Sequence, residues 1–157
     1  MQKIHPFLWF DTQAEEAMHF YCSVFKNSTP GRVLRYGDAG PGPKGSVMLC
    51  TFELEGQQFS AFNGGPHFKF NNAISLAVDC KSQEEVDTLW KKLAAGGGEQ
   101  GDCGWIKDKY GLSWQITPTV LIELIGDPDP AKAQRVMKAM MQMTKIDIAK
   151  IQQAARG

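Results

Sequence analysis

The segment that decides the fold runs from residue 71 to residue 115 and reads NNAISLAVDC KSQEEVDTLW KKLAAGGGEQ GDCGWIKDKY GLSWQ. Its apolar spacing changes from alternation to a helical period and back again. A glycine triplet, Gly96–Gly98, follows the helical part. The segment therefore predicts a strand, a helix and two more strands, over Ala73–Val78, Ser82–Ala94, Gly104–Lys107 and Leu112–Thr117.

The first predicted strand has two unlike faces. Ile74, Leu76 and Val78 share one face, and only small side chains occupy the other, so we expect the large residues to pack against the helix. Ser82 and Glu85 form a capping box at the start of that helix. The buried helical stripe is predicted to be Val86, Leu89, Trp90 and Leu93.

The same pattern occurs earlier in the chain. Met1–Phe10 predicts a strand with His5, Phe7 and Trp9 on one face, and Thr12 with Glu15 predicts a second capping box. The helix stripes match at an offset of 69, the preceding strands at 68 and the later hairpins at 55. The stripe of the earlier helix is Ala17, Phe20, Tyr21 and Val24.

This repeat predicts an α+β fold made of two β-α-β-β-β modules, at about residues 3–63 and 72–118, within a domain spanning 1–118. The linker is Gly64–Phe70. Residues 119–157 form a helical extension, with Asp129 capping one helix that reaches about Met143 and Asp147 starting another. We expect this tail to dock on its own domain or on a second subunit.

Composition excludes several classes of function. Lys and Arg together number 17, as do Asp and Glu, so no excess charge favours nucleic acid or an acidic membrane surface. No apolar run is long enough to span a bilayer, and we expect a cytoplasmic protein. The four cysteines are widely spaced without a CxxC pair, which favours unpaired structural thiols over a zinc site or disulfides.

Five motifs carry a resemblance to a known family. The chain resembles the PhnB-like branch of the vicinal oxygen chelate superfamily, which includes glyoxalase I, bleomycin resistance proteins and extradiol dioxygenases, and whose members are also labelled 3-demethylubiquinone-9 3-methyltransferase-like. The glycine triplet Gly96–Gly98 does not support the methyltransferase label, because it follows a helix, whereas a nucleotide-type cofactor loop follows a strand and opens a helix. The motifs are Pro6–Asp11, Gly64–Asn71, Cys103–Asp108, Gly111–Gln115 and Asp127–Pro130.

The resemblance also implies where a metal would bind. Metal-dependent relatives carry ligands at four positions, which fall here on His5, Ser60 (or Phe59 if the register differs by one), Ala73 and Gln115. Only His5 and Gln115 have side chains that coordinate metals, whereas catalytic sites need about three protein ligands. We therefore expect no intact metal centre and no cofactor.

Two hypotheses about function follow. In one, an enzyme handles a small organic molecule without a metal, and His5 carries the proton. In the other, which we favour, the chain is a non-catalytic binding or oligomerisation protein that keeps the cavity for a ligand or only as a remnant of packing. The alternatives are a metal-dependent glyoxalase- or dioxygenase-like enzyme and the methyltransferase of the family label. Residues expected to contact the ligand are Trp9, Ser60, Phe62, Ser75, Trp105 and Gln115.

The predicted sheets also imply an assembly. Modules of this superfamily meet edge to edge to form a cavity, either within one chain or across a dimer, because open sheet edges otherwise invite pairing. We expect a homodimer.

Overall fold

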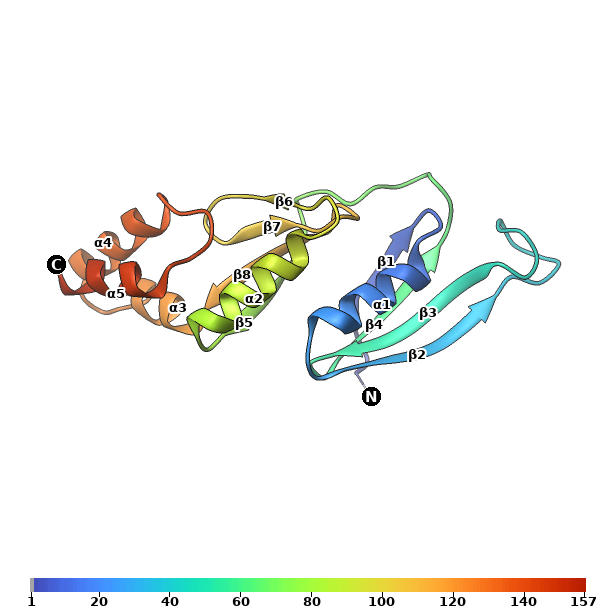
Figure 1. The fold of residues 1–157 in the computed structure, drawn as a ribbon, viewed down its shortest axis with the longest axis horizontal. Helices are drawn as coiled ribbons and strands as arrows, with labels where there is room; N and C mark the ends of the chain where they lie inside the picture. The colour runs from blue at the N-terminus through green and yellow to red at the C-terminus, as the bar shows by residue number, and fades with distance from the viewer. Residues whose placement is uncertain (1) are drawn as a thin grey trace. The chain divides into compact units, whose positions relative to one another are not determined.

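The computed structural model describes residues 2–157 and divides into two compact units, one ending at Phe70 and the other spanning Asn71–Gly157. Each unit contains one four-stranded mixed sheet with a helix on one face (Figure 1). The predicted α+β class and the duplicated β-α-β-β-β topology are confirmed.

The first unit has strand order β1-β4-β3-β2, with β1 parallel to β4 and the other neighbours antiparallel. The parallel pair is possible because α1 connects β1 to the rest of the sheet. Its elements are β1 (Phe7–Phe10), α1 (Ala14–Val24), β2 (Ser28–Arg35), β3 (Val47–Leu54) and β4 (Gln57–Asn63).

The core of the first unit lies between α1 and its sheet. Tyr21 stacks on Phe52 and Phe52 on Phe59, with ring centroids 6.2 Å and 5.4 Å apart. The predicted stripe is correct for Ala17, Tyr21 and Val24, whereas Phe20 is only half-buried and Met18 is buried instead.

Two predictions for the start of the chain are wrong. The first strand covers only Phe7–Phe10, and residues 2–6 are not strand; Met1 lies outside the described residues. Thr12 does not cap α1, since the backbone N–H of Ala14 donates instead to Asn63 Oδ1 of β4 at 2.8 Å. The first N–H of α1 is therefore bonded by a side chain from β4, and the N-cap residue Gln13 makes no capping bond with its own side chain.

The second unit repeats this arrangement with strand order β5-β8-β7-β6, and β5 runs parallel to β8. Ser60 stands opposite Phe7 in the first sheet, and Ser113 stands opposite Ser75 in the second. Since the first strands match at an offset of 68, Ser60 corresponds to Ser113, and the last strands match at an offset of 53 instead of the predicted 55. A difference of two residues leaves each side chain on the same face of its sheet. The elements are β5 (Ser75–Cys80), α2 (Gln83–Ala94), β6 (Glu99–Gln100), β7 (Trp105–Lys107) and β8 (Ser113–Pro118).

Helix α2 agrees closely with its prediction. The Glu85 N–H donates to Ser82 Oγ at 3.1 Å, while the Glu85 carboxylate accepts from the Lys81 N–H, one residue before the predicted partner. The four predicted stripe residues are buried. The strand beneath is less well covered, because β5 begins at Ser75 and leaves Ile74 65% exposed.

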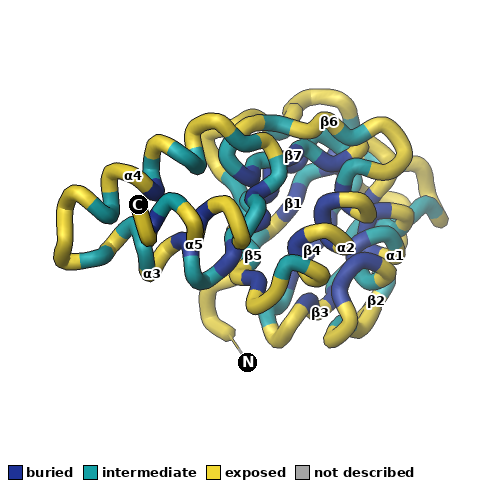
Figure 2. Tube along the Cα trace, turned by 60° about the vertical axis from the view of Figure 1, so that its left-hand side comes forward, coloured by how far each residue is buried: buried dark blue, intermediate teal, exposed yellow. Residues whose placement is uncertain are grey.

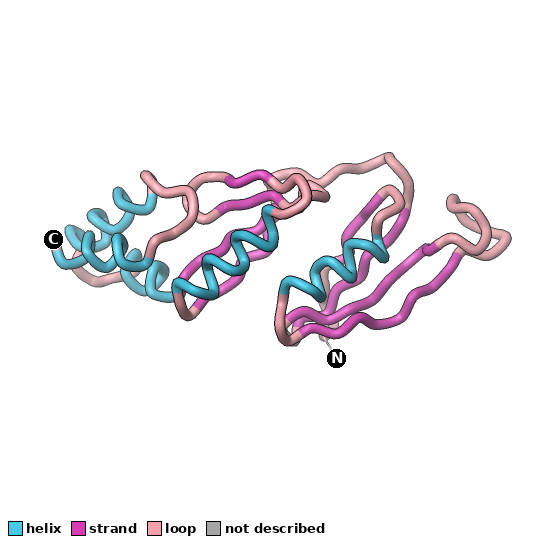
Figure 3. Tube along the Cα trace, in the orientation of Figure 1, coloured by secondary structure: helices cyan, strands magenta, loops and turns pink. Residues whose placement is uncertain are grey.

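Three helices follow β8 (Figure 3): α3 (Thr119–Ile125), α4 (Pro130–Met140) and α5 (Ile148–Arg156). Asp129 caps α4 as predicted, although α4 ends three residues before Met143, and Asp147, predicted to start the last helix, is the N-cap of α5. These helices form part of the second compact unit. The buried residues of this part of the chain, coloured dark blue in Figure 2, include an apolar cluster: Leu121, Val136, Ile146, Ile151 and Ala155. Within residues 2–157, no helix has the length and apolar character of a membrane span.

Candidate functional site

The sheet of the second unit has an open face, opposite α2, with two rows of side chains. Paired residues on neighbouring strands point to the same side, so the strand register defines each row. One row crosses all four strands as Ser75, Ser113, Lys107 and Glu99. The next crosses three strands as Ala77, Gln115 and Trp105.

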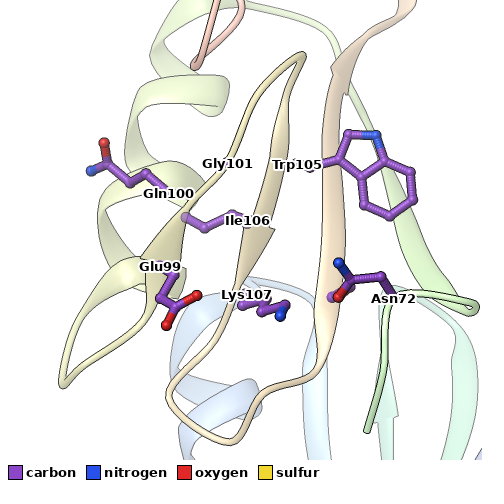
Figure 4. Close-up of a pocket in the computed structure, with 8 residues that line it drawn as sticks. Asn72, Glu99, Gln100, Gly101, Trp105, Ile106 and Lys107 are labelled. Carbon is purple, nitrogen blue, oxygen red and sulfur yellow. The ribbon is translucent and has the colours of Figure 1, made fainter.

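A cavity of about 230 Å³ lies against these rows. Figure 4 shows Lys107 between Glu99 on one side and Asn72 on the other. The Trp105 indole lies above Asn72 in this view. The cavity therefore presents an aromatic ring, an ammonium group, a carboxylate, an amide and a hydroxyl. Its lining residues are Asn72, Glu99, Gln100, Gly101, Trp105, Ile106, Lys107 and Ser113.

Hydrogen bonds fix part of this surface. Ser113, which is 1% exposed, donates from Oγ to Asn72 Oδ1 at 3.3 Å. Gln115 donates from Nε2 to Ser75 Oγ at 2.9 Å. The Asn72 Nδ2 group makes neither of these bonds, so it is available to an acceptor on a ligand.

The β6–β7 turn positions Trp105. Cys103 and Gly104 have φ values of 57° and 83°, and the Trp105 N–H donates to Asp102 O at 3.0 Å. The Gly101 N–H closes the turn by donating to Trp105 O at 2.9 Å. Trp105 is the first residue of β7, directly after this constrained turn, and it lines the cavity.

The open face of the first unit is aromatic. Phe62 contacts Phe7 and Trp9 with ring centroids 5.6 Å and 5.1 Å away. Phe68 packs edge-on against Trp9, whose Nε1 donates to Gly65 O at 2.9 Å. Phe7 and Phe68 are 56% and 66% exposed, so much of this aromatic surface faces solvent.

Ser60 lies on this open face, and Phe59 points to α1, where it stacks on Phe52. Of these two residues, Ser60 is therefore the one on the open face. His5 lies just before β1, is exposed, and has Nε2 3.3 Å from Ser60 Oγ. The pair joins the start of the module to its last strand, as Gln115 and Ser75 do in the second unit.

The residues present do not fit the metal centre of metal-dependent relatives. Ala73 has no donor atom, and His5 and Gln115 are each hydrogen-bonded to a serine of their own unit. Among residues 2–157, no cluster of three His, Cys, Asp or Glu side chains suits a metal ion. The cysteines are unpaired, as predicted, and burial raises the pKa of Cys50 to about 11 and of Cys80 to about 12, so these two thiols stay protonated at neutral pH.

The predicted ligand contacts divide between the two units. Trp9, Ser60 and Phe62 share the open face of the first unit with His5, and Ser75, Trp105 and Gln115 share that of the second. The sequence interpretation missed Lys107 and Glu99. Alternation along β7 places Lys107 on the same face as Trp105, but Glu99 is reached only through a two-residue strand with no sequence signal.

Together, the duplicated units define the glyoxalase or vicinal oxygen chelate fold. A fosfomycin resistance protein, FosX, from Listeria monocytogenes shares this fold with a TM-score of 0.52 at 18% identity, over 78% of this chain and 97% of that one. Protein PA1353 from Pseudomonas aeruginosa does so with a TM-score of 0.62 at 22% identity, over 75% and 98%.

The chain belongs to the 3-demethylubiquinone-9 3-methyltransferase family, whose model matches residues 2–117. A PhnB protein from Bacillus cereus is 42% identical and has a TM-score of 0.68, over 75% of this chain and 100% of that one. No match to the chain was found among curated proteins.

Proposed function

We propose that the protein binds a small, flat organic molecule with an acidic group in the cavity of the second unit, without a metal centre. The observation that carries this proposal is the cavity itself, where the Trp105 indole and the Lys107 ammonium group lie on the same sheet face. Ligand sites typically combine an aromatic wall with a few polar groups that fix orientation.

The order of residues in the polar row suggests where the acidic group binds. Lys107 lies between Glu99 and Ser113, and Ser113 is bonded to Asn72. Glu99 repels an anion, so the acidic group enters on the Asn72 side, where Lys107 and Asn72 Nδ2 both donate. No ion pair involves Lys107 among residues 2–157.

The residues argue against the other activities that the family suggests. A glyoxalase- or dioxygenase-type centre lacks a donor at Ala73 and has only a hydroxyl at Ser60. For methyl transfer, Gly96–Gly98 connects α2 to β6, whereas the glycine loop of a nucleotide-type cofactor connects a strand to a helix.

The binding experiment compares 2-naphthoate with its neutral amide, 2-naphthamide, by isothermal titration calorimetry. Trp105→Ala is expected to weaken naphthoate binding about tenfold, through loss of the stacking surface. Lys107→Ala is expected to abolish the preference for the acid over the amide. Lys91→Ala, at an exposed position outside the cavity, is the matched control for Lys107→Ala. Equal affinity in the Trp105→Ala variant and the unmodified protein would refute the proposal.

Contacts from the first unit remain a prediction of the sequence. Trp9, Ser60 and Phe62 offer an aromatic face with one hydroxyl, which suits the same class of ligand. The corresponding test is Trp9→Ala in the same titration, where weaker binding supports a contact and unchanged binding excludes it.

The contact between His5 and Ser60 favours a second candidate function, metal-free proton transfer. The His5 imidazole, whose Nε2 lies 3.3 Å from Ser60 Oγ, is the general acid or base of this candidate. Compounds that bind are incubated with the protein and followed by NMR. Turnover that disappears in His5→Ala supports this function, and equal turnover by His5→Ala removes it.

We also propose a homodimer, because each four-stranded sheet ends in two edge strands that natural proteins cover or pair. The exposed Phe7 and Phe68 add apolar surface that association would bury. Multi-angle light scattering at micromolar concentration is expected to give twice the chain mass, and a monomer contradicts this proposal.

A further inference from the structure

The segment that links α4 to α5, residues 141–147, contacts the turn that carries Trp105. The Cys103 N–H donates to Met143 O at 2.8 Å, and the Gly104 N–H donates to Thr144 O at 2.7 Å. Both donors belong to the two residues with positive φ in the β6–β7 turn. The backbone of the extension is therefore hydrogen-bonded directly to this turn.

Packing reinforces these two hydrogen bonds. Ile146 is fully buried, at 0% exposure, and belongs to the apolar cluster of the extension. A Cβ atom at Gly104 would lie 3.2 Å from Ile146 Cγ1 and 2.9 Å from Ile116 O. The absence of a side chain at Gly104 is thus what allows Ile146 to sit against the turn.

A second set of contacts joins the segment to the start of α2. Gln83 Nε2 donates to Ile146 O at 3.0 Å, and Gln83 Oε1 accepts from the Ile148 N–H at 2.8 Å. Lys145 Nζ lies 2.8 Å from Asp87 Oδ1. Helix α2 therefore also holds the segment in place.

We propose that this segment, residues 141–147, is a positioning element that fixes the β6–β7 turn and so orients Trp105 for ligand binding. This inference rests on the proposed function, because it assigns the extension a role at the same cavity. The family match ends at residue 117, so the helices that present the segment lie beyond the part that defines the family.

The physical argument concerns the conformation of the turn. A non-glycine residue such as Cys103 avoids positive φ unless neighbouring contacts hold it there. Trp105 follows that residue by only two positions, so a change of φ in the turn redirects the indole. The bonds from Met143 and Thr144 act on the two residues that set this direction.

The experiment weakens the segment from a position outside the cavity. Gln83→Ala removes the side chain that bridges Ile146 O and the Ile148 N–H. Ile146→Val shortens the side chain against Gly104 by one methyl group and serves as a second variant if Gln83→Ala does not fold. Arg135→Ala is the matched control, since Arg135 bonds Ala154 O and Ala155 O within the extension and does not contact the turn.

Hydrogen exchange of the Cys103 and Gly104 amides, followed by NMR, reads out the turn without any ligand. We expect Gln83→Ala to accelerate both about tenfold. We also expect weaker binding of 2-naphthoate, about threefold to tenfold, and a shifted fluorine resonance when Trp105 carries a 5-fluoro label. Arg135→Ala is expected to leave these readouts unchanged.

The outcomes separate this inference from the proposed function. Unchanged exchange at Cys103 and Gly104 in both variants would overturn the inference whatever the probe does. Faster exchange with unchanged naphthoate affinity would also overturn it, because the turn would then not position the ligand contact. If Trp105→Ala leaves naphthoate affinity intact, the proposed function fails instead, whereas the exchange rates still show whether the segment holds the turn.

Discussion

The two units of this protein share one topology and differ in what their open faces carry. In the first, the central row of that face is Trp9, Phe62, Leu49 and Leu34. In the second, the longest row is Ser75, Ser113, Lys107 and Glu99. The faces covered by helices are alike, since both are filled with apolar side chains.

This difference shows which part of a duplicated fold is free to change. A residue beneath α1 or α2 is confined by close packing, so its size and polarity follow from the fold. A residue on the open face meets no such restriction within its own unit. The polar row with its cavity, and the aromatic face of the first unit, are therefore where the function of each unit is expected.

The units also build their β-hairpin turns in different ways. In the first unit, Glu55 and Gly56 both have positive φ, 49° and 82°, which is the pattern of a tight type I′ turn. In the second, the carboxylate of Asp108 accepts from the N–H groups of Tyr110 and Leu112 and from Trp114 Nε1. Both turns contain a glycine with positive φ, since Gly111 has a φ of 86°, and the turn of the second unit adds a buried carboxylate.

The largest predicted effect concerns the Asp108 carboxylate, which is only 3% exposed. Asp108→Ala leaves the Trp114 Nε1–H and two backbone donors buried without this acceptor, and we expect a loss of about 3 kcal/mol in the stability of the second unit. Urea unfolding followed by tryptophan fluorescence measures it. The exposed Asp79→Ala control should stay within about 0.5 kcal/mol, and a similar small loss for Asp108→Ala would show that the turn does not depend on this carboxylate.

The caps of α1 and α2 are expected to contribute different amounts to the free energy of unfolding. Asn63 accepts from the Ala14 N–H and donates to Val47 O, linking α1 to two strands, whereas Ser82 caps α2 from within its own segment. We expect Asn63→Ala to cost about 2 kcal/mol and Ser82→Ala about 1 kcal/mol. Both are measured by denaturant unfolding of the same protein, and the reverse order would contradict the importance given to the cap from β4.

The turn of the first unit should be more tolerant. A Cβ at Gly56 meets no atom within 4 Å, so Gly56→Ala adds only the cost of positive φ, about 1 kcal/mol. Gly37→Ala is the control, because Gly37 has the same free space without positive φ. Equal thermal melting of the two variants would refute the conformational explanation.

The smallest predicted effect depends on pH. Hydrogen bonds from Lys145 and Gln83 lower the pKa of Asp87 below its ordinary value, so ionised Asp87 stabilises the folded state above the ordinary carboxyl pKa, and this contribution is lost as pH falls through the lowered value. The side chain is 47% exposed, which keeps the effect small. Melting temperatures of the unmodified protein and Asp87→Asn should converge in acid, and a constant difference from neutral pH to pH about 2 would contradict the assignment.

The sequence predicted what depends on neighbouring residues. Helix α2, its Ser82 cap, the Asp129 cap and the start of α5 near Asp147 were predicted because each signal lies within about one helical turn. The cap of α1 was wrong because its actual partner, Asn63, is 49 residues from Ala14. Local spacing contains no information about such a competitor.

The candidate site was predicted only in part for the same reason. Alternation placed Ser75, Gln115 and Trp105 on their strands, and the faces agree with the structure. Glu99 lies on a strand of two residues. Alternation puts Lys107 on the face of Trp105, but the row that joins Lys107 to Glu99 and Ser113 forms only because β7 pairs with both β6 and β8 in this register. Pairing between distant strands decides these positions, and a single sequence does not specify it.

The most direct test of a polar, ligand-binding second unit is an NMR titration of the labelled protein with 2-naphthoate. The account predicts backbone shift changes centred on Trp105, Lys107 and Ser113, and their loss in the Trp105→Ala variant. Changes confined to the aromatic face of the first unit, at Phe7 and Phe62, or no changes at millimolar naphthoate, would contradict it.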